Sequence, residues 1–276
     1  MKLPEIAPHL EFDPEGWWIA RGLSDVSYPD KGNALCFAVE DSSFWFGHRN
    51  LCILEALKQF PPAGGLLDIG GGNGYVARAI QQSGLDVVLL EPGLDGVRNA
   101  VKRGIRQVVR AALEDTGIMQ ETIPAVGLFD VIEHISNDRE FFTNIHRLLI
   151  PGGRVYITVP AHRWLWSDED VLAGHYRRYS VLTMGQVLEN AGYAIEFVTH
   201  FFEFLLLPIL FRRVLPYRLG RSPSRISERT VRSDHKPGHP LAARIVRSLS
   251  RRELSRISAG RSSGMGASCL IVARKL

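Results

Sequence analysis

The amino-acid sequence predicts an α/β fold in which helices cover both faces of a mainly parallel sheet. Three observations predict it. From Gly65 onward, short apolar segments alternate with segments that carry apolar residues at helical spacing. A glycine-rich turn, residues 70–74, follows the first apolar segment, and a last apolar segment, residues 267–272, lies near the end of the chain. Alternating units of this length are typical of right-handed crossovers between parallel strands.

Strands and helices are expected to alternate through the middle of the chain. The strands are expected at residues 66–69, 86–90, 105–110, 123–128, 154–159 and 193–200, and the helices at 75–83, 94–103, 138–149 and 183–190. Gly84, Gly104 and Gly192 end three of these helices, because glycine readily adopts the backbone conformation that closes a helix.

The pattern divides the chain into three parts. Residues 1–47, rich in turn formers and aromatic residues, are expected to form an N-terminal cap. The main domain is expected to comprise residues 48–200 and 267–276, and its first helix, 48–60, stops at Pro61-Pro62. Residues 201–266 form an insertion before the last strand.

The insertion opens with an apolar run at residues 201–215, followed by arginine-rich sequence. This run is shorter than the roughly 20 apolar residues that a membrane-spanning helix needs. Three roles stay open: a core helix kinked at Pro208, a lid over the substrate site, or a helix lying in a membrane interface. Residues 218–236 are expected to be disordered by composition, and residues 240–257 to form a helix with a basic face.

Charge is distributed unevenly along the chain. Residues 212–276 hold 16 Lys/Arg against 3 Asp/Glu, whereas residues 1–211 hold 17 against 26. A basic segment of this kind suits nucleic acid, anionic lipid or an acidic substrate, and is equally consistent with a solvated insertion. Three widely spaced cysteines indicate neither a disulfide framework nor a zinc site, and the N-terminus has no apolar signal core, so a cytoplasmic location is expected.

The strongest functional signal is the segment Leu67-Asp68-Ile69-Gly70-Gly71-Gly72-Asn73-Gly74. It places an acid and a glycine-rich turn between a strand and a helix, where a ligand can lie against bare backbone and a helix N-terminus favours an anionic group. Asp68 suits an ammonium group, so the pair would bind an amino-acid moiety. Glu91, at the end of the next strand, is placed to accept hydrogen bonds from ribose hydroxyls.

These features are compatible with a nicotinamide dinucleotide and with S-adenosylmethionine. Two points favour S-adenosylmethionine. Tyr75 stands where the dinucleotide fingerprint requires its third glycine, and Asp68 would lie close to a pyrophosphate.

With these residues, the sequence resembles the class I S-adenosylmethionine-dependent methyltransferases over about residues 47–200 and the last strand. LDIGGGNG, LLEPG, LFDVIEHI and LLIPGGRVYITV match successive motifs of that family. The resemblance implies a seven-stranded Rossmann-like sheet with an antiparallel last strand. Ile123-Pro124 departs from the pair usual at the start of the fourth strand. The cofactor-binding residues that the resemblance implies are Asp68, Gly70, Gly71, Gly72, Asn73, Glu91, Pro92, Ala112, Leu113 and Phe129.

Asp130, Glu133 and His134 follow the fourth strand at the carboxyl edge of the sheet, where ligands bind in such folds. His134 is a candidate general base. The spacing also resembles a divalent-metal site of some ubiquinone-pathway O-methyltransferases, although no metal is the first expectation. The third alternative is that Glu133 and His134 only brace the loop.

The loop after the fifth strand carries the candidate acceptor site. It is dense in aromatic, histidine and arginine side chains, and function concentrates on such loops. His162 and His175 are further candidate bases, and Arg177 and Arg178 could hold a carboxylate or phosphate. Trp166 and Tyr179 complete the predicted substrate residues. A packed lid pinned by Arg–Asp pairs is the alternative.

Together these observations predict an S-adenosylmethionine-dependent methyltransferase of small molecules that methylates oxygen. A lipid-linked or anionic glycan acceptor is expected, with peripheral membrane contact through residues 201–252. Nucleic acid is not expected, because the basic residues lack any accompanying RNA- or DNA-binding motif. The alternatives are a non-catalytic cofactor-binding module of the same fold and a nicotinamide-dependent oxidoreductase.

Overall fold

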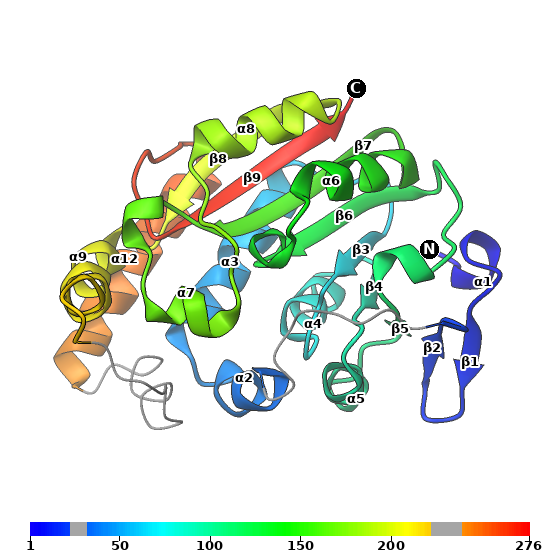
Figure 1. Ribbon diagram of the computed structural model, residues 1–276, viewed down its shortest axis with the longest axis horizontal. Coiled ribbons are helices and arrows are strands. Elements are labelled where there is room, and N and C mark those ends of the chain that lie inside the picture. The colour runs from blue at the N-terminus through cyan, green and yellow to red at the C-terminus, as the bar shows by residue number, and fades with distance from the viewer. Residues whose placement is uncertain (23–31, 222–238) are drawn as a thin grey trace.

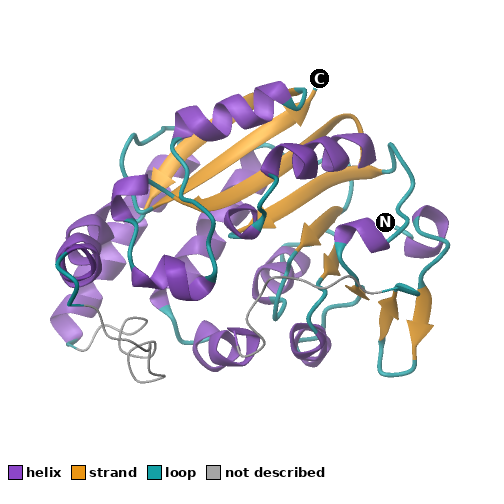
Figure 2. Cartoon of the chain, viewed as in Figure 1, coloured by secondary structure: helices purple, strands orange, loops and turns teal. Residues whose placement is uncertain are grey.

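A computed structural model of the 276-residue chain describes residues 1–22, 32–221 and 239–276. Its centre is one twisted sheet with a layer of helices on each face (Figures 1 and 2). The strands are β1 (Glu11–Asp13), β2 (Trp17–Ile19), β3 (Leu66–Ile69), β4 (Val87–Leu90), β5 (Val108–Arg110), β6 (Ile123–Phe129), β7 (Leu149–Pro160), β8 (Tyr193–Phe201) and β9 (Ser268–Lys275).

The strand order across the sheet is β1-β2-β5-β4-β3-β6-β7-β9-β8. Neighbours from β2 to β7 pair in parallel, and β9 pairs antiparallel with both β7 and β8. The predicted seven strands and the antiparallel last strand are therefore confirmed. The segment expected to be a cap adds two more strands, because the hairpin β1–β2 joins the sheet edge beside β5.

Two apolar cores lie on the two faces of the sheet. One is closed by α1 (Leu3–Ile6), α6 (Asp138–Leu148) and α8 (Val181–Asn190), and the other by α3 (Phe44–Gln59), α4 (Tyr75–Gln82), α5 (Leu94–Lys102) and α12 (Pro240–Ser258). Alternate side chains of each buried strand enter opposite cores, as Leu67 and Ile69 do against Leu66 on β3. This alternation fixes which side chains can reach a ligand at either face.

The start of β6 is irregular where Ile123-Pro124 departs from the family pattern. The register with β7 shifts between Ile123 and Ala125. Pro124 lies between them and has no backbone N–H to contribute to the ladder, so an irregularity is expected at this position. The shift lies at the far end of β6 from Phe129, and the carboxyl end of the strand is regular.

The insertion folds back against α3. It contains α9 (Leu206–Ile209), a π-helical turn at Leu210–Val214, α10 (Leu215–Arg218) and α12. Glu253 of α12 is buried and accepts hydrogen bonds from the backbone N–H groups of Phe202 and Glu203, while His48 of α3 pairs with the same carboxylate at 2.7 Å. Most of the segment 218–236, expected to be disordered, lies outside the described residues.

None of the described helices combines the length and apolar character needed to cross a bilayer. The predicted helix at 240–257 is confirmed as α12, which begins at Pro240 and ends at Ser258.

Candidate active site

The glycine-rich turn after β3 adopts backbone conformations that glycine favours. Gly70, Gly72 and Gly74 have φ values of +67°, +52° and +76°. A Cβ on Gly71 would lie 2.7 Å from Cγ of Leu89 and 2.9 Å from Oδ2 of Asp68. The turn therefore approaches its neighbours too closely for side chains, and it leads directly into α4. Such a turn exposes backbone to a ligand at a helix N-terminus.

Asp68 lies on β3 beneath this turn and is 1% exposed. Its Oδ2 atom has no hydrogen-bond partner among the described residues. Burial raises the pKa of its carboxyl from 3.8 to about 7, and the nearby Arg49 partly opposes this rise. A buried carboxylate oxygen without a hydrogen-bond donor is costly. An ammonium group of a ligand is the partner that would remove this cost.

Glu91 follows β4 and is buried beside the same turn. Its two carboxylate oxygens accept hydrogen bonds from the backbone N–H groups of Gly72 and Gly93, each at 2.9 Å. Burial raises the pKa of Glu91, while these N–H groups and the Asn33 side chain lower it. Asn33 belongs to α2 (Gly32–Glu40), so the N-terminal segment reaches the cofactor turn.

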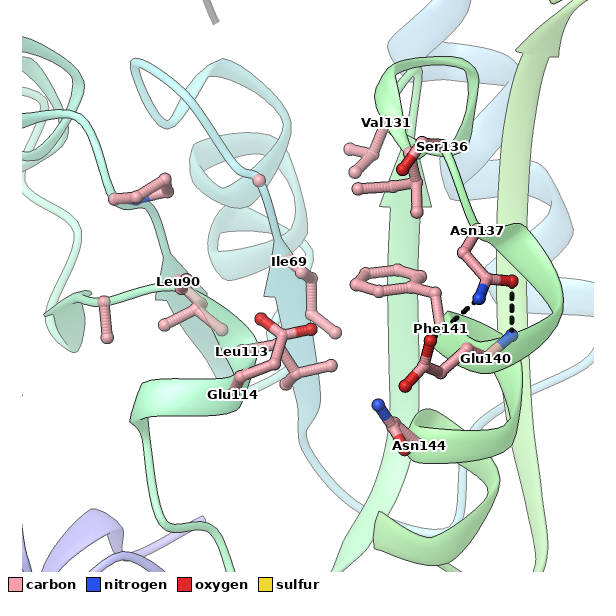
Figure 3. A pocket seen from close by; sticks show the side chains of 15 residues that line it. Ile69, Leu90, Leu113, Glu114, Val131, Ser136, Asn137, Glu140, Phe141 and Asn144 are labelled. Atoms are coloured by element: carbon pink, nitrogen blue, oxygen red, sulfur yellow. Dashed lines mark hydrogen bonds between the residues drawn. The ribbon is translucent and has the colours of Figure 1, made fainter. Parts of the chain in front are cut away.

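A cavity of about 330 Å³ lies next to Gly70, at the carboxyl ends of β3 to β6 (Figure 3). One wall carries Ile69, Leu90 and Leu113, and the opposite wall carries Val131 and Phe141. Glu114, Ser136, Asn137, Glu140 and Asn144 add polar groups. An apolar slot with a few polar groups, of this volume, suits an aromatic heterocycle such as adenine.

Beyond the cavity, Glu133, His134 and His175 come together. Their potential metal-ligand atoms lie within 4.8 Å of one another. Glu133 is fully buried, and neither carboxylate oxygen accepts a hydrogen bond from the described residues. Burial and the neighbouring Asp130 raise its pKa well above the usual range. Burial and His175 lower the pKa of His134 to about 4.

Asp170 holds His175 in this cluster. Its Oδ1 atom lies 2.9 Å from Nδ1 of His175 and accepts a hydrogen bond of 2.7 Å from Nε of Arg178. Its hydrogen bonds with His175, Arg178 and the Ser167 backbone outweigh burial and lower the pKa of Asp170, so it is a carboxylate acceptor at neutral pH. The N–H of Tyr176 donates to the Glu133 carbonyl at 2.8 Å, which ties this loop to the end of β6.

Asp130, predicted beside Glu133 and His134 as a third metal ligand, is engaged elsewhere. It pairs with Arg49 of α3 and accepts a hydrogen bond from Thr158 on β7. His175 takes the third place in the cluster instead. Arg49 was not predicted, and its sequence surroundings contain no motif that could have identified it.

The predicted acceptor residues have partners within the protein. Arg177 pairs with Asp138 at 2.7 Å, and the buried Tyr179 hydroxyl donates to the same carboxylate at 2.9 Å. Arg178 pairs with Asp170 as described. These Arg–Asp pairs match the alternative interpretation of the sequence, in which this loop is a packed lid. Arg177 and Trp166 remain half-buried rather than enclosed, so their role in acceptor binding stays a prediction.

The three candidate bases divide into two groups. His134 and His175 are neighbours, with ring centroids 4.7 Å apart. His162 instead stacks on His200, with centroids 4.9 Å apart, and also on Trp164. The structure therefore unites two of the three histidines with Glu133.

Some of the predicted cofactor residues line the cavity and others do not. Gly70, Pro92, Ala112 and Leu113 line the cavity. The Asn73 side chain forms hydrogen bonds with Asn33, Glu40 and Asn99, which connect it to α2 and α5. The Phe129 ring enters the core on the α3 face, so these two side chains do not form the cavity wall. Phe141 and Val131 supply the apolar wall on this side of the cavity.

With this geometry in view, comparison with known proteins identifies the family. The family model described as a methyltransferase domain matches residues 49–197. The chain belongs to the class I S-adenosylmethionine-dependent methyltransferase family. S-adenosylmethionine is the cofactor of this family. The nicotinamide alternative is therefore set aside, whereas the O-methyltransferase subgroup stays a prediction.

One relative is similar to this chain over part of its length. A "probable S-adenosylmethionine-dependent methyltransferase" of Mycolicibacterium smegmatis is 25% identical over 172 residues, which are 61% of this chain and 66% of that protein. The match thus spans slightly less than two thirds of that relative's length.

Solved structures share the fold. Phosphoethanolamine N-methyltransferase 2 of Haemonchus contortus, in complex with phosphomonomethylethanolamine and S-adenosylhomocysteine, has a TM-score of 0.55 at 21% identity, covering 89% of this chain and 57% of its own. A methyltransferase of Thermotoga maritima, described as a possible histamine N-methyltransferase, has a TM-score of 0.56 at 18% identity, covering 88% and 99%.

Proposed function

We propose that the protein transfers the methyl group of S-adenosylmethionine to a hydroxyl of a small or lipid-linked acceptor. The observation that carries this proposal is the Glu133–His134–His175 cluster beside the cofactor turn. A Cβ on Gly70 would lie only 2.9 Å from the Val131 side chain, so the segment that leads to His134 packs directly on that turn. Potential proton acceptors thus lie next to the place where the methyl donor is expected.

Different residues would bind different parts of the methyl donor. The Asp68 carboxylate would hold the ammonium group, Glu91 the ribose, and the cavity between Leu113 and Val131 the adenine. In the reaction, the acceptor oxygen forms a bond to the methyl carbon as the sulfur–methyl bond breaks. The bonding electron pair stays on sulfur, which yields S-adenosylhomocysteine. The hydroxyl proton has to leave the acceptor oxygen.

His175 is the best placed group to receive that proton. Its Nδ1–H donates to the Asp170 carboxylate, so its Nε2 atom has the lone pair available. The same hydrogen bond would stabilise the imidazolium that forms. His134, whose low pKa keeps it neutral at pH 7, lies beside it and adds no competing charge. General-base catalysis by such a group contributes about 10²–10⁴-fold.

The test uses tritium-labelled S-adenosylmethionine with a panel of phenols, sugars and lipid extracts as acceptors. Wild type is expected to label a hydroxyl-bearing acceptor, and His175→Gln is expected to lower kcat about 100-fold or more while the donor dissociation constant stays unchanged. His146→Gln, a histidine on α6 away from the cluster, is the matched control and should retain activity.

Two outcomes would contradict the proposal. Tight donor binding without labelling of any acceptor would favour the non-catalytic binding module. Labelling of amines alone would overturn the assignment of oxygen as the methylated atom.

The same cluster supports a second candidate role, as a divalent-cation site. Glu133 is a buried carboxylate without a hydrogen bond among the described residues, and it faces two imidazoles. Mixed nitrogen and oxygen donors suit Mn²⁺, Fe²⁺ or Zn²⁺. A cation held by Glu133, His134 and His175 would lower the pKa of a bound hydroxyl. Calorimetry with Mn²⁺ tests this role: binding that Glu133→Gln removes would support it, and no heat with wild type would reject it.

A further inference from the structure

The insertion leaves a row of large apolar side chains exposed along one helix. Leu207, Phe211 and Leu219 are 64%, 61% and 65% exposed, and Leu215 is 37% exposed. These four residues, each four positions after the last, are here named the apolar row. The helix itself is anchored in the protein, since Val214 is fully buried. The four apolar side chains are therefore exposed on a helix that is itself packed against the protein.

The π-helical turn keeps the apolar row on one side of the helix. In an α-helix of 3.6 residues per turn, residues four apart overshoot a full turn. Residues 210–214 form a π turn, which takes more than four residues, so the same spacing falls short of a full turn there. The overshoot in the α-helical turns and the shortfall in the π turn partly cancel between Leu207 and Leu219. The four side chains therefore stay on one side of the helix.

Arginines surround the apolar row. Arg212, Arg218 and Arg221 are exposed on or just beyond the same helix. Residues 201–221 and 239–261 together hold ten arginines and two carboxylates. Both carboxylates are engaged within the protein, because Glu203 pairs with Arg256, and Glu253 is buried against His48 and backbone N–H groups. The outer surface of these described segments is therefore strongly cationic.

The first half of α12 also exposes apolar and basic side chains. Leu241 and Ile245 are 60% and 51% exposed. Arg244, Arg247, Arg251 and Arg252 are exposed on the same helix, and none of them forms an ion pair with a described residue. The second half of α12 is fixed to the start of the apolar-row helix through Glu253 and Arg256. Both helices lie at one end of the molecule (Figure 1).

We infer that this end of the molecule docks on an anionic lipid surface. Exposed leucine and phenylalanine among arginines fit an interface in which apolar side chains enter the acyl boundary and guanidinium groups contact anionic headgroups. A nucleic acid would match the arginines but would leave the apolar row without a partner. No described helix is long and apolar enough to cross the bilayer, so the contact is peripheral.

The docking surface adjoins the candidate acceptor loop. Arg213 pairs with Glu169, and Arg218 donates a hydrogen bond of 3.0 Å to the Trp164 carbonyl. Docking would therefore hold the loop of residues 160–179 at the membrane. That this loop then receives a lipid-linked acceptor rests on the proposed methyl transfer, whereas the docking itself does not.

Vesicle flotation of the full-length protein without methyl donor tests the docking. Wild type is expected to float with vesicles of phosphatidylglycerol and phosphatidylcholine in equal parts, to remain unbound with phosphatidylcholine alone, and to bind less at high salt. Leu207→Ser with Phe211→Ser is expected to lower the partition coefficient about tenfold or more, because two large apolar groups no longer enter the lipid.

Phe12→Ser is the matched control for the apolar row. Phe12 is 60% exposed on β1, at the opposite end of the molecule (Figure 1), and its replacement should leave flotation unchanged. For charge, Arg244→Glu with Arg247→Glu should reduce flotation, and Arg139→Glu with Arg147→Glu on α6 should not.

Absence of flotation with the mixed vesicles would overturn the inference. Equal losses in the test and control variants would overturn it as well, as would binding to duplex DNA or RNA that the apolar-row substitutions leave intact. Because no methyl donor is present, the result is independent of the proposed catalytic activity.

Discussion

Replacement of Asp68 by asparagine should stabilise the protein without ligand and abolish donor binding. Burial raises the pKa of Asp68 from 3.8 to about 7, so the folded protein disfavours the carboxylate that the unfolded chain carries freely. One pKa unit corresponds to about 1.4 kcal/mol, so the charged carboxyl costs the fold up to about 4 kcal/mol above pH 7.

The sign of the pH dependence follows from the raised pKa. The folded state holds the proton more tightly than the unfolded state, so the cost is absent below about pH 4, grows between pH 4 and 7, and is complete above pH 7. Asp68→Asn removes the charge at every pH. Its stabilising effect should therefore be largest at pH 8 and fall to about 2 kcal/mol at pH 5.

Urea unfolding at pH 8 and pH 5, with and without S-adenosylmethionine, measures both effects. Asp86→Asn is the control, since its side chain is 60% exposed and its replacement should change stability little. Lower stability of Asp68→Asn than of wild type at pH 8, or equal stabilisation of variant and wild type by S-adenosylmethionine, would exclude this role of Asp68.

Donor affinity, the cofactor turn and the anchor of α12 can each be tested separately. The donor dissociation constant should rise about tenfold for each pH unit below 7, because Asp68 must lose its proton to pair with the ammonium group. Calorimetry that shows no change between pH 7 and pH 5.5 would contradict this. Gly71→Ala should cost about 1–3 kcal/mol and weaken donor binding, because its Cβ would lie 2.7 Å from Leu89; Gly47→Ala, with open space around it, is the control for the unfolding measurement. Glu253→Ala should cost about 3 kcal/mol, because His48 and two backbone N–H groups lose their acceptor, and limited proteolysis should then cleave near α12; an unaltered digestion pattern would refute the anchoring role.

Local sequence patterns sufficed for the central fold and the cofactor turn. The segments around Asp68 and Glu91 each contain a short buried strand and an acidic residue. A few neighbouring residues are enough to identify such a segment in the sequence. By contrast, β1 and β2 have three residues each, too few to show an alternating pattern, and their pairing with β5 depends on tertiary contacts. The seven-stranded prediction therefore missed the edge hairpin.

The candidate site was predicted less completely, for two physical reasons. His175 meets Glu133 only because the loop after β7 returns to the end of β6, where Tyr176 hydrogen-bonds the Glu133 carbonyl. No spacing along the chain encodes that return. The sequence could not show whether the Phe129 ring faces the cavity or the core, because side chains alternate between the two faces of β6.

A crystal structure of the protein with S-adenosylhomocysteine would show which residues bind each part of the cofactor. We expect electron density with the ammonium group at Asp68, the ribose at Glu91, and the adenine in the cavity between Leu113 and Val131. Density for the ligand at any other place, or an empty cavity at saturating ligand in well-ordered crystals, would show that these residues do not form the cofactor site.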